Sequence, residues 1–283
     1  MLQLIVKVIC RLDYKYENQL SELKKIILSK ALFGVDINRT AIEICRLRAW
    51  LSIIVDEDIK KNIEPLPNLD FTFICANTLI SLDEKPQMDL YDDRELKNNL
   101  IKLQNEYFYA SHKSTKKKLQ RKYNEIRTDS NMLENENSKL IKSYDPFHIQ
   151  SVSKFYDCEL HHGHKNFDII LGNPPYLKER NNSEIFKPIN KSPLGKKYHQ
   201  AKMDFWYYFL HFALNIVSEK GNITFITSSY WLNAEGAKKL IYRLKEECSF
   251  LSVVNIGDLE VFHKVAGRHM ISVFSKTKKE AFL

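Results

Sequence analysis

The stretch FDIILGNPPY, from Phe167 to Tyr176, joins an apolar strand pattern to a tetrapeptide in which two prolines separate an asparagine from a tyrosine. Each proline holds φ at about −65° and lacks an N–H donor, so the main-chain carbonyls of this turn point in preset directions. The apolar run before it is typical of a buried strand, which supplies a rigid base for the turn. The stretch therefore predicts an α/β fold with a polar loop at the carboxyl end of a strand.

The tetrapeptide Asn173-Pro174-Pro175-Tyr176 suits chemistry on a planar amino group. The side-chain oxygen of Asn173 and the carbonyl of Pro174 can accept both amino hydrogens, which draws the nitrogen toward tetrahedral geometry and frees its lone pair. The ring of Tyr176 offers a face on which a flipped base can stack. Asn173, Pro174, Pro175 and Tyr176 are therefore predicted to be catalytic in methyl transfer. A polyproline turn after a buried strand is the structural alternative.

The rest of the chain alternates between strand and helix patterns. Apolar runs bounded by turn residues predict strands, and apolar residues at helical spacing predict amphipathic helices. This alternation indicates a doubly wound sheet that closes with a hairpin. The expected strands cover 33–37, 71–75, 167–172, 222–227, 251–256 and 269–274, and the expected helices cover 2–12, 20–32, 40–54, 204–218 and 235–247.

Polar side chains follow two further strands at the points where those strands end. Asp36 closes the first strand, and Asn77 follows the second. Ligands of doubly wound sheets bind beyond the carboxyl ends of strands, and a carboxylate there is a strong acceptor for vicinal hydroxyls. The structural alternatives are an acid at a helix N-terminus for Asp36 and a turn residue for Asn77.

Length and composition set the class of protein. The chain has 283 residues, of which 44% are hydrophobic, enough for one large domain or two small ones. Lys and Arg number 43 against 35 Asp and Glu, and this net charge of +8 favours a polyanionic partner such as nucleic acid. The five cysteines are scattered, which indicates reduced thiols in the cytoplasm. Lys7 interrupts the apolar start, so neither a signal peptide nor a membrane span is expected.

Two polar segments have no assigned role. Residues from about 89 to 150 are charged and predict an inserted helical excursion, whose basic run from Lys113 to Lys122 either contacts phosphates or forms a solvated helix face. Cys158, His161, His162 and His164 lie too close together in sequence to surround one ion, and no metal site is predicted there.

Four stretches resemble the adenine-specific DNA methyltransferases of restriction-modification systems, in particular the Eco57I-like branch. The resemblance covers most of residues 25–276 and implies a Rossmann-like sheet that uses S-adenosylmethionine as methyl donor and double-stranded DNA as substrate. It also implies one catalytic domain over residues 1–283. The matching stretches are FGVDIN with AIEICRLRAWLS, PLPNLDFTFICANTL, FDIILGNPPYLKER, and KYHQAKMDFWYYFLHFAL followed by GNITFITSSYWLNAEGAKKL.

The resemblance also implies roles for individual residues. Asp36 takes the ribose hydroxyls of S-adenosylmethionine, Ile37 flanks its adenine, and Asn77 contacts the adenine edge. Lys178 and Arg180, just past the tetrapeptide, are positioned to meet the DNA backbone, although flexible surface bases would look the same.

Two further positions come from the same resemblance. The resemblance implies that Asp204 supports the catalytic loop or the donor pocket. The structural alternative is an acid that caps a helix. Where some relatives carry a second stacking aromatic, this chain has Gly236 and Ala237. Tyr230 or Trp231 can substitute, and core aromatics are the alternative.

The chain departs from the family before Asp36. Relatives carry a central strand and a glycine-rich loop of DPACGSG type there, whereas the first glycine of this chain is Gly34. We therefore expect an incomplete sheet without its central first strand, and little activity unless another chain supplies the donor-binding loop. The long carboxyl-terminal region that reads the DNA sequence in relatives is also expected to be missing.

Two other functions stay open. Protein glutamine methyltransferases use the same tetrapeptide on a planar amide, and the missing donor loop favours a non-catalytic remnant or subunit that binds nucleic acid or a partner. The basic charge and the long insertion favour DNA methylation.

Overall fold

The computed structural model describes residues 1–57, 69, 71–82, 93–110, 112–129, 135–148, 150–257 and 268–277. These residues form two compact units. The first comprises Met1–Asn77 and Pro86–Gly163, and the second comprises Thr78–Lys85 and His164–Leu283. The expected turn at 65–68 and the start of the expected insertion at 89–92 lie outside the described residues.

The first unit contains a two-stranded parallel sheet. Strand β1 (Gly34–Asp36) pairs with β2 (Phe73–Cys75) in the register Gly34 to Phe73 and Asp36 to Cys75. Helix α3 (Arg39–Ile54) connects them, and the side chain of Asn38 accepts from Ala41 N to cap its first turn. The amino-terminal helices are α1 (Leu2–Leu12), the short 3₁₀ turn η1 (Tyr14–Asn18) and α2 (Leu20–Lys30).

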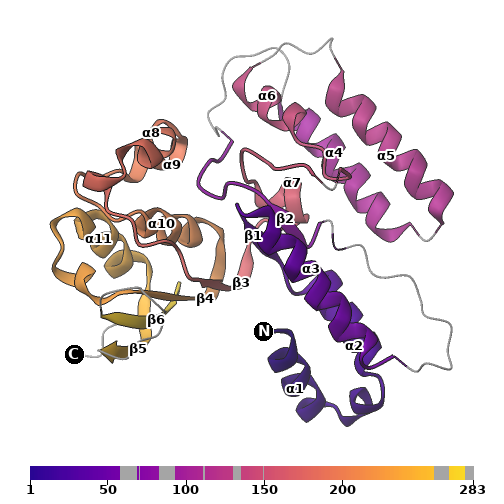
Figure 1. The fold of residues 1–283 in the computed structure, drawn as a ribbon, viewed down its shortest axis with the longest axis horizontal. Coiled ribbons are helices and arrows are strands. Elements are labelled where there is room, and N and C mark those ends of the chain that lie inside the picture. The colour runs from indigo at the N-terminus through magenta and orange to yellow at the C-terminus, as the bar shows by residue number, and fades with distance from the viewer. Residues whose placement is uncertain are drawn as a thin grey trace. The chain divides into compact units, whose positions relative to one another are not determined.

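The insertion in the first unit is helical where it is described. Tyr107, Tyr123 and Phe71 surround the ring of Phe147 at centroid distances of 4.9, 5.2 and 5.6 Å, so an aromatic core joins these helices to the sheet region. The helices are α4 (Asp93–Tyr109), α5 (Lys113–Thr128), α6 (Glu136–Ser143) and the short α7 (Cys158–His162) (Figure 1).

The second unit contains a four-stranded mixed sheet in the order β3-β4-β6-β5. β3 is parallel to β4, whereas β6 is antiparallel to both β4 and β5. Figure 1 shows α10 and α11 on one face of this sheet. The strands are β3 (Phe167–Gly172), β4 (Val217–Ser228), β5 (Ser249–Gly257) and β6 (His269–Ser275). The helices are α8 (Ser183–Lys191), α9 (Pro193–Tyr198), α10 (Trp206–Ile216) and α11 (Lys238–Glu247), with 3₁₀ turns η2 (Glu179–Asn181), η3 (Ser229–Asn233) and η4 (Glu235–Ala237).

Aromatic residues dominate the core of the second unit. Trp206 is fully buried and meets Trp231 edge-on at a centroid distance of 5.6 Å. Ile223 and Phe225 of β4 and Phe274 of β6 present the sheet side of the same core. This packing fixes the sheet against α10 and therefore the loops at the carboxyl ends of β3 and β4.

The α/β class expected from the sequence is confirmed, and the chain ends its described strands with the expected hairpin. The strands that the structure describes form two sheets rather than one continuous sheet. β1 and β3 are both edge strands among the strands that the structure describes. No helix of the described residues is long and apolar enough to cross a membrane.

Candidate active site

The tetrapeptide leaves the sheet directly at the end of β3. Gly172 is the last residue of β3 and pairs with Phe225 of β4. A Cβ atom at Gly172 would lie 2.7 Å from the Phe225 ring, so this position admits only glycine without a shift of the ring. Asn173 is exposed at the start of the loop, and Pro174 is buried. The strand thus holds the loop rigidly while the Asn173 side chain faces solvent.

Tyr176 returns to the sheet and is half-buried. Its hydroxyl lies 3.0 Å from the main-chain oxygen of Ile226 in β4 and 3.3 Å from Oδ1 of Asn173. Its ring centroid is 5.5 Å from that of His269. Burial raises the pKa of the Tyr176 phenol to about 12, so its hydroxyl stays protonated at neutral pH. One end of the predicted stacking residue is therefore anchored to the sheet.

The residues after the tetrapeptide are held by the segment that leads into α10. Phe205 N donates to Leu177 O at 2.7 Å, and Glu179 N donates to Met203 O at 3.2 Å. Between them, Lys178 and Asp204 form an antiparallel bridge. The loop is therefore braced along its length by main-chain hydrogen bonds.

Asp204 belongs to this brace and is not a side-chain cap of α10, whose N-cap is Phe205. The pKa of the Asp204 carboxyl is raised because the group is partly buried, and the nearby Lys178 ammonium offsets part of that rise. Of the two interpretations of Asp204, support of the loop agrees with this geometry.

Glu179 adds a second clamp that the sequence pattern did not reveal. Its carboxylate oxygens accept from Lys202 N at 3.0 Å and contact His199 Nε2 at 2.7 Å. The partners are 20 and 23 residues distant in sequence, so no local spacing could have indicated them. Lys178 and Arg180 on either side are exposed, as both the DNA-contact and the surface-base interpretations require.

The three predicted donor-binding residues come together in the first unit. Because Asp36 is paired with Cys75, Ile37 and Asn77 lie just beyond the same end of the β1–β2 sheet. Ile37 is 66% exposed. Asp36 accepts from Asn38 N at 2.6 Å, and Asn77 N donates to Ser153 O at 3.1 Å. The Asp36 contact closes a turn just before Asn38, the cap of α3, and it uses only one of the two carboxylate oxygens.

The predicted residues thus form two groups in two separate units. Asp36, Ile37 and Asn77 form the group in the first unit, and the tetrapeptide with Lys178 and Arg180 forms the group in the second.

The remaining candidates are mostly structural. His161 is buried, with Nε2 3.1 Å from Ser153 Oγ, and burial lowers its pKa to about 4. His162 Nδ1 lies 2.7 Å from Phe71 O. No group of three His, Cys, Asp or Glu that could hold a metal ion occurs in the part of the chain that the structure describes. Trp231 is a core residue, whereas Tyr230 is 64% exposed.

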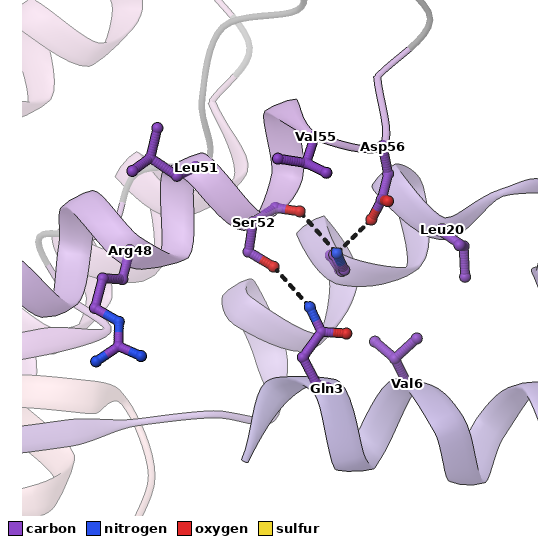
Figure 2. Close-up of a pocket in the computed structure, with 9 residues that line it drawn as sticks. Gln3, Val6, Leu20, Arg48, Leu51, Ser52, Val55 and Asp56 are labelled. Carbon is purple, nitrogen blue, oxygen red and sulfur yellow. Dashed lines mark hydrogen bonds and ion pairs between the residues drawn. The ribbon is translucent and has the colours of Figure 1, made fainter.

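A groove of about 430 Å³ lies among α1, α2 and α3 and contains none of the predicted site residues (Figure 2). At its centre, the buried ammonium of Lys24 donates to Ser52 O at 2.7 Å and pairs with Asp56. Gln3 Nε2 donates to Ser52 Oγ at 3.3 Å from the facing helix. These contacts pair four of the five polar residues that line the groove, which indicates a structural seam between helices.

Comparison with known proteins identifies the family. The model of the Eco57I restriction-modification methylase family matches residues 30–262. The chain belongs to this family. The match includes β1, β2, the tetrapeptide and most of the second unit, and it confirms the family expected from the sequence.

Individual relatives are much longer than this chain. It is 28% identical over 113 residues to the type II methyltransferase M.HincII of Haemophilus influenzae, and the aligned residues cover 40% of this chain and 22% of that protein. It is 23% identical over 247 residues to the type II restriction enzyme and methyltransferase RM.Eco57I of Escherichia coli, which covers 85% of this chain and 18% of that protein. The chain therefore spans about a fifth of the length of these relatives.

Among solved structures, the ATP-dependent type ISP restriction-modification enzyme LlaBIII bound to DNA aligns with 96% of this chain and 16% of its own. The TM-score is 0.47 at 14% identity. Membership of a methylase family supports S-adenosylmethionine as the methyl donor.

Proposed function

We propose that this chain transfers a methyl group from S-adenosylmethionine to the exocyclic amino group of a flipped adenine in double-stranded DNA, as part of a restriction-modification system. The observation that carries the proposal is the loop after β3. Asn173 is exposed there beside Pro174, and the loop is anchored at both ends by β3 and by the segment before α10. This is the preorganised acceptor pair that a planar amino group requires.

The chemistry assigned to these residues is direct in-line attack by the amino nitrogen, with no covalent enzyme intermediate. Asn173 Oδ1 and Pro174 O accept the two amino hydrogens, so the nitrogen lone pair becomes available as its geometry turns tetrahedral. Tyr176 stacks on the flipped base through its remaining ring surface. S-adenosylmethionine supplies the electrophilic methyl group when bound.

The other predicted residues bind the two substrates. Asp36 accepts from the ribose hydroxyls of the donor through the carboxylate oxygen that Asn38 leaves open, while Ile37 and Asn77 contact the donor adenine. Lys178 and Arg180 lie on the surface just past the loop and contact DNA phosphates.

We propose further that donor binding needs a polypeptide segment beyond the described strands, supplied by another chain or a longer form of this one. Two observations support this proposal. β3 is an edge strand of its sheet, and its Ile169 and Leu171 side chains are 64% and 51% exposed. Ile170 on the opposite face packs on the core, and apolar residues on both faces are typical of a strand that is covered on both faces. Isothermal titration of S-adenosylmethionine into this chain alone tests the idea, because micromolar binding contradicts it.

The methyl-transfer proposal is tested by incubating double-stranded DNA with the chain and S-adenosylmethionine that carries a tritiated methyl group. We expect slow incorporation into adenine at stoichiometric enzyme, and its loss in Asn173→Ala. The matched control is Asn233→Ala, an exposed asparagine of η3 outside the loop. Label in protein instead of DNA would reassign the substrate to a glutamine amide. No label in either, with binding of both DNA and S-adenosylmethionine retained, would identify a non-catalytic subunit.

A further inference from the structure

The hydroxyl of Tyr176 faces two acceptors with a single hydrogen. Ile226 O lies at 3.0 Å and Asn173 Oδ1 at 3.3 Å. A main-chain carbonyl can only accept, and it makes the shorter contact, so it takes the hydroxyl hydrogen. The phenol then has only lone pairs to offer Asn173.

The carboxamide of Asn173 can satisfy those lone pairs in one orientation only. Its oxygen and nitrogen ends have nearly the same shape, so a half-turn about the last side-chain bond exchanges them without moving the loop. With Nδ2 toward the phenol, the amide donates to Tyr176 Oη, and the carboxamide oxygen turns to the opposite side. The opposite orientation leaves two oxygens face to face without a hydrogen between them.

The anchor for this arrangement is rigid. Ile226 is the β4 residue after Phe225, which makes the last pair with β3, and it continues to pair with Ile271 of β6. The Tyr176 ring packs on the core of the second unit. Burial raises the pKa of the Tyr176 phenol to about 12, so the hydroxyl keeps its hydrogen and stays a donor over the whole physiological pH range.

We propose that Tyr176 is a positioning residue whose hydroxyl, fixed by Ile226 O, orients the Asn173 carboxamide so that its oxygen faces the target amino group. This role rests on the proposed methyl transfer and is separate from stacking, which needs only the ring. The orientation matters because an amide nitrogen in that place would meet the target amino group donor to donor, and the lone pair would not be freed.

The test compares Tyr176→Phe, which keeps the ring and removes the hydroxyl, with Tyr198→Phe. Tyr198 is the matched control because its hydroxyl donates to Asn215 Oδ1 at 3.2 Å elsewhere in the same unit. The first readout is the side-chain amide signal of Asn173 in ¹⁵N NMR, assigned by its absence in Asn173→Ala. In Tyr176→Phe we expect this signal to move upfield and its hydrogens to exchange faster, with no change in Tyr198→Phe. An unchanged signal in Tyr176→Phe overturns the proposal, whether or not the chain methylates DNA.

The second readout is turnover. We expect kcat of Tyr176→Phe to fall about fivefold, the factor that corresponds to one hydrogen bond of about 1 kcal/mol, while KM for DNA stays within about twofold. A loss in KM with unchanged kcat assigns the hydroxyl to base binding and overturns the positioning role. If the wild-type chain labels no DNA because the further donor-binding segment is absent, the NMR readout alone decides how Asn173 is held.

Discussion

Replacement of Gly236 by alanine is expected to loosen the brace behind the candidate catalytic loop. Gly236 is buried in η4, and a Cβ atom there would lie 2.3 Å from Lys202 O and 2.6 Å from Met203 N. Ordinary contact begins at 3.4 Å, so η4 and the 202–203 segment must separate by about 1 Å. Both obstacles are main-chain atoms, which cannot turn aside as a flexible side chain can. Overpacking of this kind costs about 1–3 kcal/mol of the free energy of unfolding.

The assay must resolve the two units, since they need not unfold together. The chain has three tryptophans, of which Trp50 lies in the first unit and Trp206 and Trp231 lie in the second. Labelling with 5-fluorotryptophan gives each unit its own ¹⁹F signals during urea titration. With a urea dependence of about 2 kcal/mol per molar, Gly236→Ala should lower the midpoint of the second unit by about 0.5–1.5 M and leave that of the first unchanged. Lys238→Ala, an exposed neighbour, is the control. Equal midpoints for Gly236→Ala and the parent chain would refute the reasoning.

Three further predictions follow from buried and exposed charges. Burial lowers the pKa of His161 from 6.5 to about 4. As pH falls, the imidazole therefore gains a proton in the unfolded chain before it does so in the folded chain. The free energy of unfolding of the first unit should fall as pH falls from 6.5 toward 4. The Trp50 signal in urea at pH 7 and pH 5 measures this loss, and His161→Gln should remove its pH dependence. Asp56→Ala leaves the Lys24 ammonium buried with one main-chain acceptor and should lower the free energy of unfolding by about 3 kcal/mol or more. Lys24→Met removes the buried charge and should lower it by less. Equal losses of unfolding free energy for the two variants in urea titration would contradict this reasoning. Joint replacement of Lys178 and Arg180 by alanine should lower the magnitude of the slope of log K against log salt concentration for DNA binding by about 1–2. An unchanged slope, which is the result expected for the control Lys245→Ala, would mean that the two residues are surface bases without phosphate contacts.

The elements that local patterns specify were predictable from the sequence. β3 was expected over 167–172 and has those bounds, because an apolar run followed by two prolines has few alternatives. The helix expected over 40–54 is α3 at Arg39–Ile54, and Asn38 caps it. β4 begins at Val217 rather than at 222, because Lys220 adopts a positive φ of 67° and the strand continues through a segment that reads as a turn.

Elements that depend on tertiary packing were not predictable in the same way. α8 contains Pro188, and α9 begins with Pro193. Prolines at such close spacing suggest loops, but the buried Phe186 and Ile189 hold α8 on the core of the second unit. The same holds in the site, where Tyr176 reaches Ile226 and Glu179 reaches His199 across 50 and 20 residues. A local motif indicates the candidate catalytic residues, whereas the contacts that support them come from distant segments.

The proposed donor-binding segment predicts a link between the stability of the second unit and donor binding, through two exposed apolar residues of β3. Ile169 and Leu171 are 64% and 51% exposed, and burial of the exposed part of each is worth about 1 kcal/mol or somewhat more. A segment that pairs with the β3 edge and also covers this face gains main-chain hydrogen bonds and this apolar burial together. It also ends beside the loop that begins at Asn173, because β3 carries that loop at its carboxyl end. If that segment brings the donor-binding loop, the second unit should unfold at higher urea in its presence, and the rise should grow with S-adenosylmethionine concentration, because a ligand that binds only the folded state stabilises it. A rise that is independent of the donor would mean that the edge is covered by a segment with no part in donor binding.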